Sequence, residues 1–325
     1  MAFDDPASWQ PWLRSPGYQA LATLAWLGLL ILAVCSLLPH LAWAHKLELA
    51  SHFRFQFALL CLLLPPIFLG LRQGVPVLLA LLLVCWNGWE IAPWYLGDPK
   101  PNPGLGKPLK LLMSNMLYTN PDTSRLQALI EQEKPDVVVI EELSWRQVNL
   151  MTELAKAYPY QIHDTFQGAF GIGIWSRWPL AEAQQLMLGP VPSLYARLDW
   201  DGQPVHLLAT HPFPPVDEVA FKERNRQYQA IRELLKSKPG EQILLGDLNI
   251  TPWSPYYRQL VESTGLYNAR RGFGLTPTWP TNFPPLLRIP IDHALLSPSL
   301  KVLKWQTGPE LGSDHLPILL SIIRS

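Results

Sequence analysis

The stretch Ile-Leu-Leu-Gly-Asp-Leu-Asn-Ile, residues 243–250, decides the fold that we predict. Its first three residues are apolar and suit a strand that is buried on both faces. Asp247 and Asn249 follow two residues apart, so both point to one side if the strand geometry persists. An ordinary turn, in which Asp and Asn are common, is the alternative. Because a buried charge needs a partner or a metal, the stretch also predicts a functional site.

Other apolar runs of the chain end in polar residues in the same way. Each of these residues has a plain explanation as a turn former or a structural side chain, but their recurrence indicates one shared site. Adjacent strand residues face opposite ways, so we expect only one of the two neighbouring glutamates to point into it. In chain order the residues are Asn115, Glu141, Glu142, His211, Asp292, Asp314 and His315.

Composition separates two parts of the chain. The 325 residues carry no net charge, 48% are hydrophobic and only 16% are charged, which is a low charged fraction for a soluble protein. The lack of a basic excess is weak evidence against a dedicated nucleic-acid binder. All three cysteines, Cys35, Cys61 and Cys85, lie in the apolar N-terminal part, so the remainder has no disulfide framework and no cysteine zinc site.

The N-terminal third has the pattern of a multi-pass membrane anchor. Residues 19–38, 55–71 and 75–95 are apolar runs near the length that spans a bilayer, and Pro65-Pro66 predicts a kink in the second run. We therefore expect about three transmembrane helices within residues 1–96, with a hydrophobic soluble bundle as the alternative. Taken literally, the Lys/Arg distribution places the remainder in the cytoplasm. That count depends on lysines next to the following domain, so the side of the membrane stays open.

Residues 97–108 are rich in Pro and Gly and predict a linker, which leaves 109–325 as a globular domain. In this domain short apolar strands alternate with helical patterns, for example at 124–133 and 218–235. The alternation indicates an α/β fold, and we favour a sheet-on-sheet sandwich flanked by helices.

The polar residues collected at the strand ends suggest a chemistry. Carboxylates with amide and imidazole partners suit a hard cation such as Mg²⁺ or Mn²⁺, and the domain has no cysteine that would favour a softer metal. A metal, a base and hydrogen-bond donors are the components needed to hydrolyse a phosphate ester.

Several motifs of this domain resemble the endonuclease/exonuclease/phosphatase superfamily, which contains DNase I-like nucleases, neutral sphingomyelinases and inositol-polyphosphate phosphatases. The resemblance covers essentially all of residues 109–323, with the motifs in family order. It implies a four-layer α/β sandwich (DNase I-like) and a Mg²⁺-dependent phosphoesterase. The motifs are Asn115 after a strand, Val138-Val139-Ile140-Glu141-Glu142, Gly246-Asp247-Leu248-Asn249, Ile291-Asp292-His293 and Ser313-Asp314-His315-Leu316-Pro317.

The resemblance also implies roles for the metal-binding and base residues. Glu142 is expected to hold Mg²⁺ with Asn115 beside it, and Asp247 to orient or deprotonate the attacking water. Glu141 stands where many members have Gln, so the resemblance leaves open which of the two glutamates binds metal.

The remaining residues are expected to act on the phosphate. Asn249 is expected to hold the scissile phosphate, and His315 to contact or protonate it, steered by Asp292 or Asp314. His211 occupies the place of a second histidine found in nuclease-like members.

Three functions follow from this sequence. The first is a membrane-anchored, metal-dependent phosphoesterase that acts on a phosphomonoester or phosphodiester, and neutrality and the anchor favour a lipid or small-molecule phosphate. The second is a metal-dependent endonuclease or exonuclease, with nucleic acid as its partner. The third, a non-catalytic membrane scaffold, is disfavoured because every expected polar position is occupied.

Overall fold

The computed structural model describes residues 10–13, 15–40, 44–97, 106–145, 147, 152, 154–165 and 168–325. The chain divides into two compact units, Met1–Ala92 and Pro93–Ser325. The first unit contains the apolar runs and the second contains the polar strand ends. The predicted linker at 97–108 overlaps residues 98–105, which lie outside the described residues.

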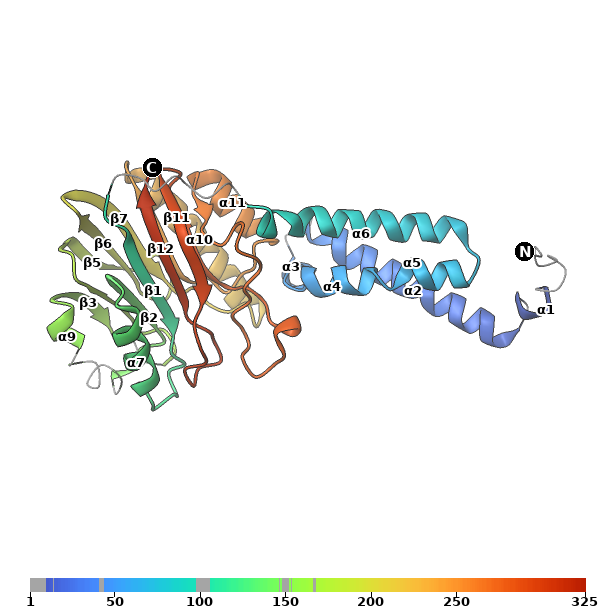
Figure 1. Cartoon of the computed structure of the whole chain (residues 1–325), viewed down its shortest axis with the longest axis horizontal. Helices are drawn as coiled ribbons and strands as arrows, with labels where there is room; N and C mark the ends of the chain where they lie inside the picture. The colour runs from blue at the N-terminus through green and yellow to red at the C-terminus, as the bar shows by residue number, and fades with distance from the viewer. Residues whose placement is uncertain are drawn as a thin grey trace. The chain divides into compact units, whose positions relative to one another are not determined.

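The first unit is helical, and two of its helices are long and apolar enough to cross a membrane, or three if a pair of shorter helices bent by 64° forms one span. The two long ones are α2 and α6 (Figure 1). The helices are α1 (Gln10–Leu13), α2 (Pro16–Leu37), η2 (Leu38–His40), α3 (His45–Ser51), α4 (Arg54–Cys61), α5 (Leu64–Gly70) and α6 (Gly74–Tyr95), whose last residues belong to the second unit.

The second apolar run is interrupted directly before Pro65-Pro66, since α4 ends at Cys61 and α5 begins at Leu64, but the largest bend of this region lies elsewhere. The 64° bend lies between α3 and α4, from Ser51 to Arg54. The two prolines occupy the first turn of α5, where backbone N–H groups have no partner within the helix, so proline removes no hydrogen bond there.

The second unit contains two mixed sheets of six strands each. In the first sheet the order is β11-β12-β1-β2-β4-β3, and in the second it is β5-β6-β7-β8-β10-β9. The strands are β1 (Leu109–Asn115), β2 (Val137–Glu141), β3 (Tyr160–Asp164), β4 (Ile172–Ser176), β5 (Leu180–Leu186), β6 (Ser193–Trp200), β7 (Gln203–Thr210), β8 (Gln242–Asp247), β9 (Tyr267–Asn268), β10 (Asp292–Leu296), β11 (Leu300–Thr307) and β12 (Ile318–Arg324).

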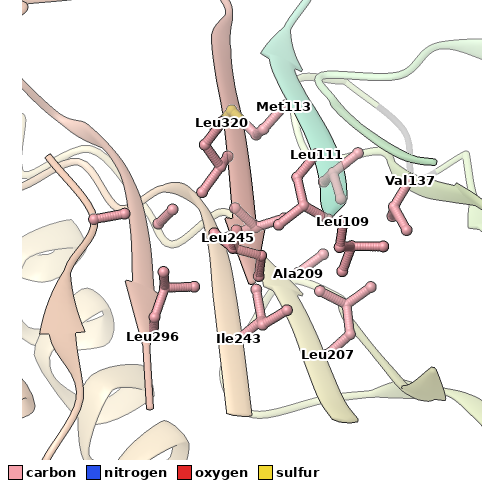
Figure 2. Packing of buried hydrophobic residues seen from close by; sticks show 14 of the residues in the cluster. Leu109, Leu111, Met113, Val137, Leu207, Ala209, Ile243, Leu245, Leu296 and Leu320 are labelled. Atoms are coloured by element: carbon pink, nitrogen blue, oxygen red, sulfur yellow. The ribbon is translucent and has the colours of Figure 1, made fainter. Parts of the chain in front are cut away.

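The core of this unit lies between the two sheets (Figure 2). Leu111 and Val137 from the first sheet pack with Leu207, Ile243 and Leu245 from the second, and all five are fully buried or nearly so. Strands β1, β2, β7 and β8 are buried along most of their length, as expected for strands covered on both faces.

Helices cover the outer face of each sheet (Figure 1). On the first sheet lie α7 (Ser124–Glu133) and the short α9 (Leu154–Ala157), and on the second lie α10 (Glu218–Ser237) and α11 (Pro255–Thr264). A 3₁₀ turn, η4 (Pro285–Leu287), lies in the loop before β10. The predicted α/β sandwich flanked by helices is confirmed.

Candidate active site

Strand pairing brings the polar residues together at one end of the sandwich. The parallel strands β1 and β2 are in register at Asn115 and Glu141, and the antiparallel strands β8 and β10 are in register at Asp247 and Asp292. Because parallel strands end at the same edge, Thr210 at the end of β7 delivers His211 to this edge as well. The folded sheets thus place side chains far apart in the sequence next to one another.

Asp247 is the centre of this arrangement and is buried. Its Oδ2 atom lies 3.5 Å from Nε2 of His211 and 3.5 Å from Nε2 of His315, and accepts a 3.4 Å hydrogen bond from Asn115 Nδ2. Its Oδ1 atom accepts a 2.8 Å hydrogen bond from the backbone N–H of Asn249. One carboxylate therefore contacts three distant segments of the chain in addition to its own.

Both neighbouring glutamates reach the site, contrary to the prediction that only one would. Glu142 has a left-handed backbone (φ 54°), so strand alternation stops before it. Its Oε1 atom accepts a 3.0 Å hydrogen bond from Asn115 Nδ2, and its Oε2 atom accepts one from the N–H of Tyr118. Glu141 is fully buried and accepts a 2.8 Å hydrogen bond from the backbone N–H of Asp247.

The two glutamates differ in environment. Burial, followed by the nearby carboxylate of Asp247, raises the pKa of Glu141 well above its ordinary value, which favours its neutral form. Glu142 is only half-buried and keeps its carboxylate within reach of solvent. A neutral glutamic acid has nearly the shape of the glutamine that the family resemblance places at this position.

His315 and Asp292 form a buried pair. His315 Nδ1 lies 3.0 Å from Oδ2 of Asp292. Burial alone would lower the pKa of His315, but the carboxylates of Asp292 and Asp247 outweigh it and raise this pKa to about 10. Burial alone would likewise raise the pKa of Asp292, and the His315 imidazolium lowers it overall. At neutral pH the pair is therefore an imidazolium next to a carboxylate.

Asp314 lies to one side of this pair. Its Oδ2 atom accepts a 2.9 Å hydrogen bond from Trp279 Nε1, and the Trp279 ring lies 6.4 Å from the His315 ring, centroid to centroid. Of the two carboxylates predicted to steer His315, Asp292 and not Asp314 is the one that contacts its Nδ1 atom. Ser313 Oγ donates to the carbonyl of Asn115, which ties this loop to the end of β1.

Asn249 and His211 complete the site. Asn249 has a left-handed backbone (φ 51°), and its Nδ2 donates a 3.0 Å hydrogen bond to the carbonyl of Pro212. The His211 ring contacts Phe170, which in turn packs edge-on against Phe213. Every predicted site residue thus lies in this one region.

Two buried arginines support the site and have no distinctive signal in the sequence. Arg224 on α10 donates a 3.0 Å hydrogen bond to the carbonyl of Asn249. Arg270 donates a 2.5 Å hydrogen bond to the carbonyl of Asp292. A helical charge such as Arg224 is usually solvated, so only the position of Asn249 in the fold reveals its partner.

His293, next to Asp292, is a structural residue. Its Nε2 lies 2.8 Å from the carbonyl of Ile250, and its Nδ1 accepts a hydrogen bond from Asn268 Nδ2 at 2.9 Å. Burial, with Arg270 nearby, lowers the pKa of His293 to about 3, so the ring stays neutral. Its neutral tautomer satisfies both partners without a ligand.

The donor set suits a hard divalent cation. Donor atoms of Asp247, Asp292 and His315 lie within 4.8 Å of one another. Glu142 supplies further carboxylate oxygen atoms, and Asn115 Nδ2 bridges Glu142 and Asp247. In the described part of the chain, no Lys or Arg side chain forms an ion pair with Glu142 or Asp247. Excess negative charge with oxygen donors is the environment that Mg²⁺ or Mn²⁺ prefers.

Comparison with known proteins agrees with this geometry. The model of the endonuclease/exonuclease/phosphatase family matches residues 112–315. No match was found among curated proteins.

Solved structures share the fold at low sequence identity. TDP2 from D. rerio in complex with a single-strand DNA product is 19% identical, with a TM-score of 0.56 over 67% of this chain and 99% of that one. An endonuclease/exonuclease/phosphatase from Bacteroides vulgatus is 17% identical, with a TM-score of 0.56 over 67% of this chain and 100% of that one.

Proposed function

Because the chain belongs to the endonuclease/exonuclease/phosphatase family, we propose that it is a membrane-anchored, Mg²⁺-dependent phosphoesterase that hydrolyses a lipid or small-molecule phosphate ester. The observation that carries this proposal is the environment of Asp247, whose carboxylate contacts Asn115, His211 and His315. A base, a cationic donor and oxygen ligands for a metal are all within one cluster.

Asp247 and His315 have complementary roles in this mechanism. Asp247 orients the attacking water and accepts its proton, which requires the ionised carboxylate. His315, protonated because Asp292 and Asp247 raise its pKa to about 10, donates a hydrogen bond or a proton to the phosphate oxygen. Asp292 fixes the ring by accepting from Nδ1, which leaves Nε2 directed at the reacting centre.

Asn249 and His211 bind the phosphate from the side of the second sheet. Asn249 Nδ2 uses one proton on Pro212 and keeps the second for a phosphate oxygen. His211 Nε2 lies 3.5 Å from Asp247, on the same side as His315 Nε2. Two imidazoles and a carboxamide thus surround the position where negative charge develops.

Glu142 and Asn115 are the proposed metal ligands, with Asp247 next to them. When bound, the cation would polarise the phosphate and offset its charge. His315 Nδ1 is held by Asp292, and we assign its Nε2 to the phosphate, so His315 is not among the proposed ligands although its ring lies next to Asp247. Glu141 is not among the proposed ligands because it is fully buried and its Oε2 atom accepts a hydrogen bond from the backbone N–H of Asp247.

The apolar helices of the first unit support the membrane anchor. The spans Pro16–His40 and Gly74–Tyr95 meet the length and composition of membrane helices. An enzyme held at a bilayer has ready access to lipid phosphates, and the neutral composition of the chain gives no electrostatic advantage for a nucleic acid.

A nuclease is the second candidate, favoured by one comparison. The similar TDP2 structure from D. rerio holds a single-strand DNA product. We rank it below a lipid or small-molecule ester because this chain has no basic excess to attract phosphate backbones.

A substrate panel tests the proposal. We expect the full chain, purified in detergent, to hydrolyse bis-p-nitrophenyl phosphate with Mg²⁺ and to lose this activity in EDTA. Sphingomyelin and phosphoinositides in mixed micelles, compared with plasmid and single-stranded DNA, then decide the substrate class. Turnover of DNA alone would favour the nuclease, and no turnover of any ester would favour a scaffold.

A further inference from the structure

Exposed large apolar side chains gather in the segments that connect strands at the active-site end of the sandwich. We consider the exposed large hydrophobic residues among the described residues from Leu109 onward. All of them except Tyr160 lie in segments that follow a strand end or precede a strand start at the end of the sandwich that carries the active site. These residues are Tyr118, Trp145, Met187, Val216, Val219, Phe283, Leu286 and Leu287.

The strand registers fix this end. Met187 follows Leu186, which pairs with Ser193, and Ser193 in turn pairs with Thr210, next to His211. Tyr160 pairs with Ser176, opposite the start of β2 and so at the far end from Glu141. Clustering at one end is unlike the scattered single residues that a soluble surface normally shows.

The most prominent part of this cluster is the loop at residues 281–288. Phe283, Leu286 and Leu287 are 48%, 60% and 50% exposed. No residue from 276 to 287 is charged. The loop therefore presents three large apolar side chains to its surroundings without a charge among them.

This loop is ordered by its own hydrogen bonds. Arg288 donates from Nε to the carbonyl of Phe283 and from Nη2 to the carbonyl of Thr281, both at 2.8 Å. The N–H of Leu287 donates to the carbonyl of Pro284 at 2.9 Å. These bonds satisfy carbonyls within the loop, which lowers the cost of bringing the tip into an apolar medium.

The loop is also joined to the catalytic motif. Thr281 N donates to the carbonyl of Asp314, and Thr281 Oγ1 donates to the carbonyl of Ser313, each at 2.9 Å. Both accepting residues directly precede His315. Whatever contacts the loop tip is thus held at a fixed place relative to the proposed acid.

We infer that the loop at 281–288 inserts its apolar tip into the surface of a lipid bilayer and so faces the active site toward lipid-borne phosphate esters. This inference rests on the proposed function and narrows its substrate to an ester presented at a membrane surface. The occupant is a bilayer because the same chain carries helices of membrane-spanning length. Chain connectivity keeps the domain within reach of that bilayer, and an uncharged apolar tip suits the headgroup–acyl boundary.

A depth measurement tests the contact directly. The full chain, with its three native cysteines replaced by alanine, is spin-labelled at Leu287→Cys and reconstituted in phosphatidylcholine nanodiscs. Tyr160→Cys is the matched control, an exposed position at the opposite end. Oxygen concentrates in the acyl region and a nickel chelate in water. We expect the Leu287→Cys label to be more accessible to oxygen than to the nickel chelate, and the Tyr160→Cys label to be more accessible to the nickel chelate.

An activity measurement tests the consequence. Phe283→Ser, Leu286→Ser and Leu287→Ser combined should leave turnover of bis-p-nitrophenyl phosphate within about twofold of wild type, because none of these side chains lies in the catalytic cluster. Turnover of the lipid ester that wild type hydrolyses, sphingomyelin or a phosphoinositide, should fall about tenfold or more when the lipid is presented in vesicles. Tyr160→Ser should change neither rate.

Two results would overturn the inference. One is equal nickel access at both labelled positions, and the other is a Leu287→Cys label shielded from both reagents at every protein dilution, which would assign the tip to a protein contact. Failure of wild type to hydrolyse any ester would refute the proposed function, while the labels would still decide the membrane contact.

Discussion

The two halves of the site differ in their access to solvent. On one side Glu142 presents a half-buried carboxylate, whose Oε1 atom accepts a hydrogen bond from Nδ2 of the buried Asn115. Asp247, Asp292 and His315 are buried and form a chain of carboxylate–imidazole contacts. The first half suits an ion that enters from water, whereas the second suits proton transfer, in which low polarity strengthens each charge interaction.

Because of this difference, we expect mutations in the two parts of the site to respond differently to added metal. A ligand that exchanges with solvent can be compensated by more metal, because binding follows mass action. A buried acid–base pair has no such substitute, because its protonation states depend on neighbours fixed by the fold. Mutations in the two halves should therefore differ in whether added Mg²⁺ rescues them.

The largest effect is expected in the buried half. Asp247→Asn or His315→Ala should lower kcat by about two orders of magnitude or more, the range typical of general acid–base groups. Added Mg²⁺ should not restore it. Steady-state kinetics and melting curves on the same proteins check this, since a purely structural role would lower Tm along with kcat. A folded variant with near-normal kcat contradicts the assignment.

For the half-buried residue Glu142 we expect a smaller loss of activity, which added metal can restore. Glu142→Gln should weaken Mg²⁺ binding about 10- to 100-fold, as loss of a ligand or its orienting partner does. Activity should return at high Mg²⁺. Calorimetric titration measures the affinity directly.

Glu141→Gln is the matched control for this variant. Because burial raises the pKa of Glu141 and favours its neutral form, the amide should keep the hydrogen bond from Asp247 N and leave metal affinity nearly unchanged. Loss of affinity in Glu141→Gln, with Glu142→Gln normal, would exchange the two roles.

The pair His315–Asp292 makes a prediction about pH. The carboxylates of Asp292 and Asp247 raise the pKa of His315 to about 10, so the protonated ring persists at neutral pH and is lost as the pH rises through that value. Asp292→Asn removes one of these two carboxylates and so lowers the pKa of His315. The alkaline limb of kcat should therefore move to lower pH. A pH–rate profile of both proteins checks the shift, and an unmoved limb would contradict the pairing.

The same pair contributes to stability with a definite sign. A histidine whose pKa is raised on folding stabilises the protein fully below the pKa of the unfolded chain, about 6.5. That contribution declines as the pH rises toward 10. The difference in Tm between wild type and Asp292→Asn should therefore shrink from pH 6 to pH 10, as measured by calorimetry.

Periodicity and strand-end chemistry predicted the sandwich and the residues of the site. Strands such as β8 are predictable because apolar runs buried on both faces carry a strong signal. The exposed strand β5 and the short β9 lack such runs and were not predicted, and β3, β6 and β11 were also missed. The resemblance supplied roles that spacing alone does not, and those roles remain predictions.

Local backbone conformation and long-range contact partners could not be predicted from the sequence. The left-handed turn at Glu142 brings both glutamates to the site, yet nothing in the residues around it signals a positive φ. Trp253 and Tyr257 follow Asn249 closely in the sequence, yet both are buried, and Tyr257 packs from α11 into the core. Helical spacing places a residue on a face but does not identify its contact partner.

The smallest effect is expected for a residue that acts only through another. Arg224 donates to the carbonyl of Asn249, whose left-handed backbone presents the carboxamide. Arg224→Met removes this donor at similar volume, so kcat should fall about three- to tenfold through looser placement of Asn249, as expected for a misplaced substrate-binding group. A hydrogen bond from a charged donor is also worth about 1.5–3 kcal/mol of stability. Kinetics well below the Tm of both proteins separate the two effects, and Arg224→Lys should recover part of kcat. Normal kcat with a lowered Tm would make Arg224 a structural residue only, which would leave the placement of Asn249 to its bonds with Pro212 and Asp247.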